Sequence, residues 1–188
     1  MKTPFAVIVA ALLASTLPSA HADQKVVAAQ SEIAFTSRQM GVPVDGKFRK
    51  FDAQIAFDPK NPGSAKIALT IDLASAALGA ADTEAELAKP DWFDTKKFPQ
   101  AAFQSTTVSS AGAGKFNVAG KLSIKSISRD LVVPITLTQA AGQTTASGKF
   151  QIKRLDFKIG DGEWKDTSIV ADPVDVSFKI VLTGVGPL

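Results

Sequence analysis

Two serine–lysine pairs are the clearest candidates for nucleophilic chemistry in this sequence. Ser123 and Lys125 are separated by one residue, and so are Ser147 and Lys149. Residues two apart on a β-strand share a face, so each amine can lie beside a hydroxyl and serve as its base. Alternating polar residues on a solvated strand produce the same spacing by chance. We therefore assign no catalytic residue and predict that the protein is not an enzyme.

Two groups of carboxylates offer a second kind of chemistry, either calcium binding or a glycosidase pair. The first group is Asp82, Glu84 and Glu86, and the second is Asp161, Glu163 and Asp166. Acidic residues are also favoured in the first turn of a helix and are common in solvated turns. Because these explanations are simpler, we predict no metal site and no cofactor.

The sequence is poor in the residue types that most active sites use. It has no cysteine and no tyrosine, and its one histidine, His21, lies in the N-terminal segment. Catalysis near neutral pH, and zinc or haem binding, use these side chains most often. The composition therefore favours a protein that binds a molecule over one that transforms it.

The N-terminal segment has the organisation of a secretory signal peptide. Lys2 precedes an uncharged apolar run, Phe5 to Leu17, and small residues lead up to Ala22. The run is about 13 residues, which suits a cleaved signal, whereas a membrane span needs roughly 20. We predict a signal peptide over 1–22, cleaved after Ala22, and a periplasmic protein over 23–188 without a transmembrane segment. An uncleaved N-terminal anchor is the alternative.

Charged residues are interspersed along the chain, and the formal net charge is +3. Nucleic-acid binding requires a basic stripe or patch, and none is visible, so we predict no nucleic-acid partner. No internal repeat or linker divides the mature chain, which predicts a single domain.

Alternating apolar residues define the elements that position these side chains. In the segment 65–73, Ile67, Leu69 and Ile71 share one face, as in a half-buried antiparallel strand. Further strands are expected over 32–37, 42–57, 101–108, 116–124, 131–137, 144–157 and 174–182. A capping residue and early acids predict one short helix over 82–89, with a further turn at 91–94. The fold class predicted is all-β: an eight-stranded antiparallel up-and-down barrel with one short helix.

Three local features make more detailed predictions. Within 42–57, the apolar residues fall on even-numbered positions up to Phe48 and on odd-numbered positions from Phe51. This shift by one residue predicts a β-bulge near Arg49 and Lys50. Pro134 lacks a backbone donor and should lie at a bulge or an unpaired stretch. Arg154 and Asp156 are two residues apart, where they can pair, and we expect them to be structural.

Aromatic residues are frequent on the faces that should point into the barrel. A barrel of about eight strands is either filled by its own side chains or encloses one ligand, and the pattern alone leaves both open. A ligand in such a cavity should be long and apolar, since burial contributes about 0.8 kcal/mol per methylene.

Five sequence blocks in a characteristic order resemble the YceI-like family of periplasmic, lipocalin-like polyisoprenoid-binding proteins. The match runs from about Ser31 to Leu182. The blocks are 31–35; 44–48 with 51–55; 92–94 leading to 98–103; 120–124; and Arg154-x-Asp156-Phe157-x-Ile159-Gly160. The resemblance departs at Ser126-Ile127-Ser128, where the family usually has glycine followed by Val-Thr.

The resemblance implies a lipocalin-like barrel whose cavity holds an isoprenoid lipid or quinone-type ligand, and a non-catalytic carrier function. The candidate wall residues are Phe35, Phe48, Phe51, Ile55, Ile67, Leu69, Ile71, Trp92, Phe93, Phe103, Leu122, Ile124, Leu131, Val133 and Phe178. One alternative is a stress-related structural protein with a self-filled core, and another is a lipid-acting hydrolase or isomerase. Long exposed strands leave a homodimer open.

Overall fold

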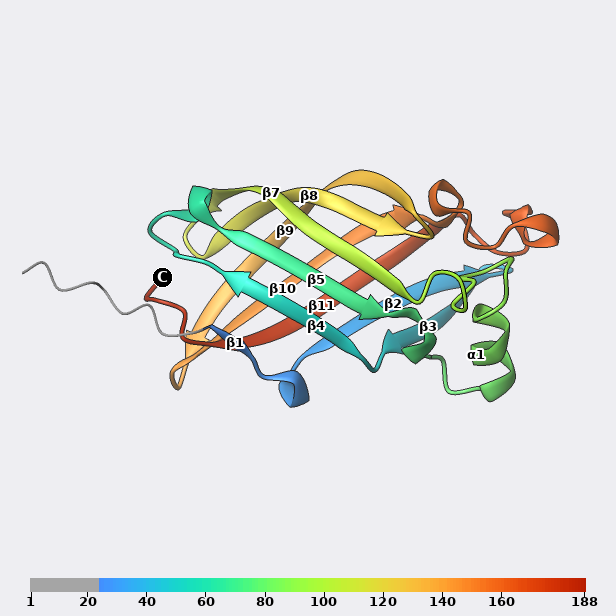
Figure 1. The fold of residues 1–188 in the computed structure, drawn as a ribbon, viewed down its shortest axis with the longest axis horizontal. Helices are drawn as coiled ribbons and strands as arrows, with labels where there is room; N and C mark the ends of the chain where they lie inside the picture. Colours follow the sequence, from blue (N-terminus) through green and yellow to red (C-terminus); the bar gives the residue numbers. More distant parts are fainter. Residues whose placement is uncertain (1–23) are drawn as a thin grey trace, which may run out of the picture.

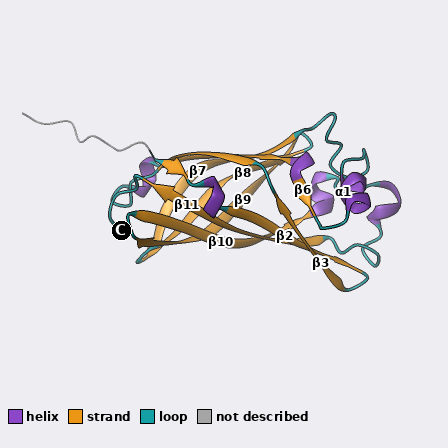
Figure 2. Cartoon of the chain, turned by 90° about the horizontal axis from the view of Figure 1, so that it is seen from below, coloured by secondary structure: helices purple, strands orange, loops and turns teal. Residues whose placement is uncertain are grey.

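Antiparallel strands wind into an elongated barrel in the computed structural model, which describes residues 24–188 (Figure 1). The predicted signal peptide lies outside the described residues. The helix α1 and several 3₁₀ turns gather at one end of the barrel, and the C-terminus lies near the other (Figures 1 and 2). No helix within residues 24–188 is both long enough and apolar enough to cross a membrane.

The sheet follows the chain in an up-and-down order, and the pairing of β11 with β2 brings the last strand back beside the N-terminal part of the chain. The order of hydrogen-bonded neighbours is β4-β5-β7-β8-β9-β10-β11-β2-β3-β6, and β1 pairs with β11. The strands are β1 Lys25–Val26, β2 Glu32–Gln39, β3 Val42–Phe48, β4 Phe51–Ala56, β5 Lys66–Asp72, β6 Ala76–Ala77, β7 Gln100–Gly112, β8 Lys115–Ile124, β9 Ile127–Ala140, β10 Gln143–Lys153 and β11 Pro173–Thr183. The helix α1 spans Ala81–Leu87, and 3₁₀ turns include η3 Leu73–Ser75, η4 Arg154–Phe157 and η5 Gly162–Lys165.

The predicted all-β antiparallel barrel with one short helix is confirmed, but the strand count is eleven instead of eight. Two of the additional strands, β1 and β6, have two residues each, too few for an alternating pattern. The third arises because the predicted strand 42–57 is divided into β3 and β4. The predicted strand 144–157 ends early, since η4 begins at Arg154.

The break between β3 and β4 explains the change of apolar parity in this part of the sequence. Phe48 and Phe51 flank the break and both belong to the interior, while Arg49 and Lys50 are exposed. Ser75 of η3 holds the bend: its carbonyl accepts from the Arg49 N–H at 3.1 Å, and its hydroxyl accepts from the Lys50 N–H at 3.0 Å. The predicted β-bulge is wrong: the parity change near Arg49 and Lys50 comes from a break between two strands that pair with different neighbours.

Pro134 marks the position where β9 and β10 stop pairing with each other. The pairing of β9 with β10 runs from Ala140 opposite Gln143 to Ile135 opposite Gly148, and stops there. Pro134 comes next and cannot donate a backbone hydrogen bond. Beyond it β9 pairs only with β8, and β10 only with β11. The prediction of a locally unpaired stretch is confirmed.

The barrel end opposite α1 is filled by the protein's own side chains. Phe57, Phe116 and Leu137 form a buried cluster with Val108, and the rings of Phe57 and Phe116 meet edge to face at 5.1 Å. Gln24 closes this end, because its side-chain amide exchanges two hydrogen bonds with the Phe57 backbone. Any cavity must therefore open elsewhere.

Arg154 organises the end that carries α1. Its side chain is 1% exposed, and all five guanidinium N–H groups donate to backbone carbonyls at 2.6–3.1 Å. The acceptors all lie in the segment that connects β10 to β11: Ile159, Gly160, Trp164, Val170 and Ala171. The expected pairing with Asp156 is wrong, because η4 turns the chain away from a strand. The structural role expected for Arg154 is confirmed.

Gly160 is needed for this arrangement. It has a φ of +75°, and a side chain there would also collide with the Arg154 guanidinium. Glycine alone meets both demands at low cost.

We predict that Arg154→Met lowers the free energy of unfolding by at least about 3 kcal/mol, because it leaves several buried carbonyls without donors. Arg154→Lys should recover only part of this loss, since an ammonium has three donors in place of five. Urea denaturation followed by circular dichroism measures both effects.

The matched control is Arg129→Met, since Arg129 is exposed and, among the described residues, its side chain donates only to the carbonyl of its neighbour Ser128. Its effect should stay within about 0.5 kcal/mol. Equal losses at the two positions would contradict the role given to Arg154.

Candidate ligand-binding cavity

The interior of the barrel contains two adjacent, mainly apolar chambers. The inner chamber, near the middle of the barrel, has a volume of about 140 Å³, and the outer chamber, toward α1, about 420 Å³. They share the lining residues Ile33, Ile71, Leu122, Phe150 and Val176. The outer chamber alone falls in the size range of small-molecule sites. The barrel is therefore hollow between its filled end and α1.

The structure places fourteen of the fifteen predicted wall residues around these chambers. Those at the inner chamber are Ile55, Ile67, Leu69, Ile71, Phe103, Leu122, Leu131, Val133 and Phe178. Those at the outer chamber alone are Phe35, Phe48, Trp92, Phe93 and Ile124. Phe51 lines neither chamber and packs instead beside the buried cluster of Ile33, Ile180 and Leu182. Contact of these residues with a ligand stays a prediction.

Several wall residues were missed by the sequence reasoning, for three different reasons. Phe150, Ile152, Val174 and Val176 alternate along expected strands, so the same pattern could have identified them. The same holds for Ile33, Val118, Ile135 and Ile180. Ala53 and Ala102 also lie on strands but are too small to stand out as cavity wall. The residues without any strand periodicity lie before or in α1 and in the β10–β11 segment; they include Leu78, Leu87, Ile159, Trp164 and Val170.

Three phenylalanine rings occupy the space left by glycines on adjacent strands. Phe35 lies on Gly46, Phe103 on Gly120 and Phe178 on Gly148, and a Cβ on any of these glycines would come within 3.0 Å of ring carbons. Two of the pairs are direct register partners. Each ring lies against the backbone of the adjacent strand, at the glycine. It therefore takes up less of the lumen than a ring that points toward the barrel axis.

Polar groups enter the lining only at the end that carries α1. The inner chamber is lined by eighteen residues, all of them apolar. The outer chamber adds Ser37 and Gln39 from the end of β2 and Asp82, Thr83 and Glu86 from α1. The polarity of the cavity therefore rises from the middle of the barrel toward α1.

Two tryptophans stand together in the wall of the outer chamber. The rings of Trp92 and Trp164 lie 5.4 Å apart between centroids. The indole N–H of Trp92 is buried and has no hydrogen-bond partner among the described residues. A buried donor without an acceptor is costly. The nitrogen itself has almost no accessible surface, so it does not face the open part of the chamber.

Lys125 fixes the position of Trp92 and does not activate Ser123. Lys125 and Ser126 both have positive φ and form the turn between β8 and β9, so Lys125 has left the strand face of Ser123. The Lys125 ammonium donates to the carbonyls of Pro90, Trp92 and Lys158 at 2.6–2.9 Å. Burial lowers the pKa of this amine. The expected serine–lysine geometry is wrong here, and the Ser123 hydroxyl bonds Ser128 instead.

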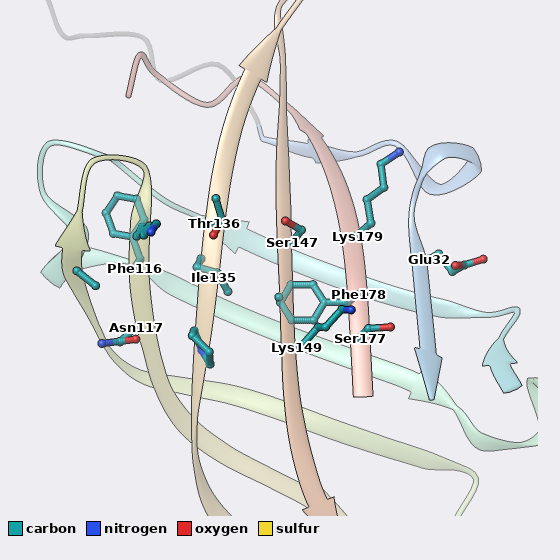
Figure 3. Close-up of a pocket in the computed structure, with 14 residues that line it drawn as sticks. Glu32, Phe116, Asn117, Ile135, Thr136, Ser147, Lys149, Ser177, Phe178 and Lys179 are labelled. Atoms are coloured by element: carbon teal, nitrogen blue, oxygen red, sulfur yellow. The ribbon is translucent and has the colours of Figure 1, made fainter. Parts of the chain in front are cut away.

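The second serine–lysine pair lies on the outer face of the barrel. Ser147 and Lys149 are exposed on β10, beside a hollow of about 650 Å³ that opens to solvent (Figure 3). No hydrogen bond joins their side chains in the described part of the chain. Figure 3 shows polar side chains from neighbouring strands around them, including Thr136 and Lys179. This open surface lacks the enclosure that the interior chambers provide.

The carboxylates mostly serve local structure. Glu84 accepts from the Leu78 and Gly79 N–H groups ahead of α1. A hydrogen bond from Lys165 lowers the pKa of Asp161, and hydrogen bonds from Ser168 lower that of Asp166. Within residues 24–188, no three histidine, aspartate or glutamate side chains gather as a metal site would require.

Known proteins share both the sequence pattern and the fold. The model of the YceI-like domain matches residues 24–182. BcnA of Burkholderia cenocepacia is 44% identical and superposes with a TM-score of 0.81 over 84% of this chain and 99% of its own. A UPF0312 protein of Photorhabdus laumondii is 31% identical over 125 residues, which cover 62% of this chain and 65% of the relative. A polyisoprenoid-binding domain from Saccharophagus degradans, at 16% identity, shares the fold with a TM-score of 0.70, covering 86% of this chain and 98% of its own.

We predict that Gly46→Ala destabilises the protein by about 1–3 kcal/mol, because the new methyl group displaces the Phe35 ring. Phe35→Leu should remove most of this penalty, so the two substitutions will not be additive. Denaturant unfolding of the two single variants and the double variant measures the coupling energy.

Gly63→Ala is the matched control, since a Cβ at Gly63 would meet nothing within 4 Å and its φ is not positive. Additive effects at Gly46 and Phe35 would contradict the packing described for this pair.

Proposed function

The chain belongs to the YceI-like family, and from that membership we propose that it binds a long isoprenoid lipid or quinone tail in the barrel cavity and carries it unchanged. The proposed location is the periplasm, as the N-terminal signal pattern predicts. The mature protein would then hold an apolar molecule apart from water while it moves away from a membrane.

The apolar inner chamber is the single observation that carries this proposal. A wall of eighteen apolar residues offers a hydrocarbon chain an environment free of polar groups. Each buried methylene contributes about 0.8 kcal/mol, so affinity should grow with tail length until the lumen is full. The two chambers favour this proposal over a structural protein whose core is filled by its own side chains.

The fold and the chemistry of the wall agree with a binding role. The domain from Saccharophagus degradans that shares this fold is described as polyisoprenoid-binding. No ionisable residue lines the inner chamber, so a lipid tail held there meets no group that could act as an acid, base or nucleophile. These observations support a carrier over a lipid hydrolase or isomerase.

Intrinsic fluorescence provides a direct measurement of filling. The chain has two tryptophans, and both line the outer chamber. A ligand that displaces water from this chamber should change their emission. Solvent extraction of the purified protein, followed by mass spectrometry, tests in parallel whether a lipid accompanies it.

We predict that Ala53→Phe weakens the binding of a long isoprenoid alcohol by about tenfold or more, because the ring obstructs the inner chamber. Titration of tryptophan emission measures the dissociation constant. Ala53 lines that chamber, and its neighbour Gln54 is exposed on the outer face.

Gln54→Phe therefore adds the same ring outside the cavity and should leave affinity unchanged. Two results would overturn the proposed function: an unmodified protein that neither contains nor takes up an isoprenoid lipid, or equal affinity in the two variants.

A further inference from the structure

Three of the five exposed large apolar side chains within residues 24–188 gather at one tip of the barrel. Met40 and Val42 are 73% and 63% exposed, and both belong to the hairpin of β2 and β3. Ile169 is 38% exposed and lies beside Met40, since the Met40 N–H donates to the Ile169 carbonyl at 2.7 Å. The β2–β3 hairpin reaches the end of the barrel that carries α1 (Figures 1 and 2). We call Met40, Val42 and Ile169 the apolar tip.

The hairpin turn exposes Met40 at a conformational cost. Met40 and Gly41 both have positive φ, +47° and +81°, as the two central residues of a type I′ hairpin turn do. Asparagine, aspartate and glycine favour this conformation, whereas a methionine there is uncommon. If the turn alone determined this position, asparagine would suit it better. The methionine therefore indicates a function for its exposed side chain.

No charged residue interrupts the apolar tip. The hairpin segment 39–44 and the segment 167–171 contain no aspartate, glutamate, lysine or arginine. A bridge between Gln39 and Val170 holds the two segments side by side. Burial of an unpaired charge is the largest cost of entry into an apolar phase, and the apolar tip avoids that cost.

The apolar tip is continuous with the lining of the outer chamber. Val44 follows Val42 by two residues on β3, so the two share a strand face, and Val44 lines that chamber. Val170 follows Ile169 directly, is buried, and lines the chamber as well. Two apolar tracks thus lead from solvent to the cavity.

A bilayer fits this surface better than a protein partner does. A standard protein interface buries about 800 Å² on each side, which three side chains cannot supply. A second protein seated there would also cover the residues through which the tracks reach the chamber. Apolar side chains that enter the boundary between headgroups and acyl chains are held by buried apolar area, without a partner of matching shape.

We propose that the apolar tip inserts into the surface of a phospholipid bilayer and places the outer chamber against the membrane that supplies the isoprenoid. The role in uptake rests on the proposed function, whereas the docking itself does not. Because the apolar tip is uncharged, docking should depend little on salt.

The first test measures docking without any isoprenoid, by sedimentation of the mature protein with vesicles of phosphatidylethanolamine and phosphatidylcholine. Val42→Thr should lower the partition coefficient about threefold or more, because it places a hydroxyl in the apolar tip. Val132→Thr is the matched control, since Val132 is 58% exposed on β9 and lines neither chamber. Equal effects of the two threonines, or an unmodified protein that stays in the supernatant, would overturn the proposal.

The second test separates the turn from the apolar tip. Met40→Asn should raise the urea concentration at the unfolding midpoint, because asparagine suits the positive φ. The same variant should lower vesicle partition about threefold or more, because the apolar side chain is lost. A more stable protein that docks less well is the expected result, and unchanged partition would contradict the role given to Met40.

The third test links docking to uptake. Tryptophan emission follows the transfer of geranylgeraniol from the same vesicles. Val42→Thr should slow this transfer about threefold and leave the affinity for geranylgeraniol supplied from cyclodextrin unchanged, since Val42 lines neither chamber. If transfer is not slowed, docking has no role in uptake and the proposed function stands. If the unmodified protein takes up geranylgeraniol from neither source, the proposed function fails, and the sedimentation result alone decides on docking.

Discussion

The buried guanidinium of Arg154 is the interaction on which the open end of the barrel depends. The segment that connects β10 to β11 has little regular secondary structure, and its carbonyls converge on this one side chain. Buried carbonyls need donors, and Arg154 supplies five from a single rigid plane. Without it, the segment that places Trp164 in the cavity wall would have no common anchor.

Lys125 also donates to several backbone carbonyls and so holds irregular segments together. Its ammonium joins the β8–β9 turn, the loop of Trp92 and the residue after η4 through three carbonyls. Within residues 24–188, neither cation lies in direct contact with a carboxylate; both hold irregular backbone together. As a result, these two cations near the cavity have no donors left for a ligand.

The parts of the structure that repeat along the chain could be predicted from sequence. Alternation in strands such as β5 and β8 identified the barrel and most of its wall, and Pro134 identified where the wall separates. Features that depend on a single turn could not be predicted. Positive φ at Lys125 moves its amine away from Ser123, and η4 moves Arg154 away from Asp156. Residues of α1 reach the cavity through tertiary packing, for which a local pattern carries no signal.

The glycine–phenylalanine pairs differ in how freely the lumen could be reshaped. The three atoms nearest to a Cβ at Gly46 would all be ring carbons of Phe35, so the pair Gly46 and Phe35 divides one shared volume between two side-chain positions. A Cβ at Gly120 or Gly148 would instead lie 2.4 or 2.5 Å from a backbone carbonyl oxygen of the neighbouring strand. Exchanging Gly46 and Phe35 for two medium-sized residues would therefore reshape the lumen locally, whereas the other two glycines are fixed by the strands beside them.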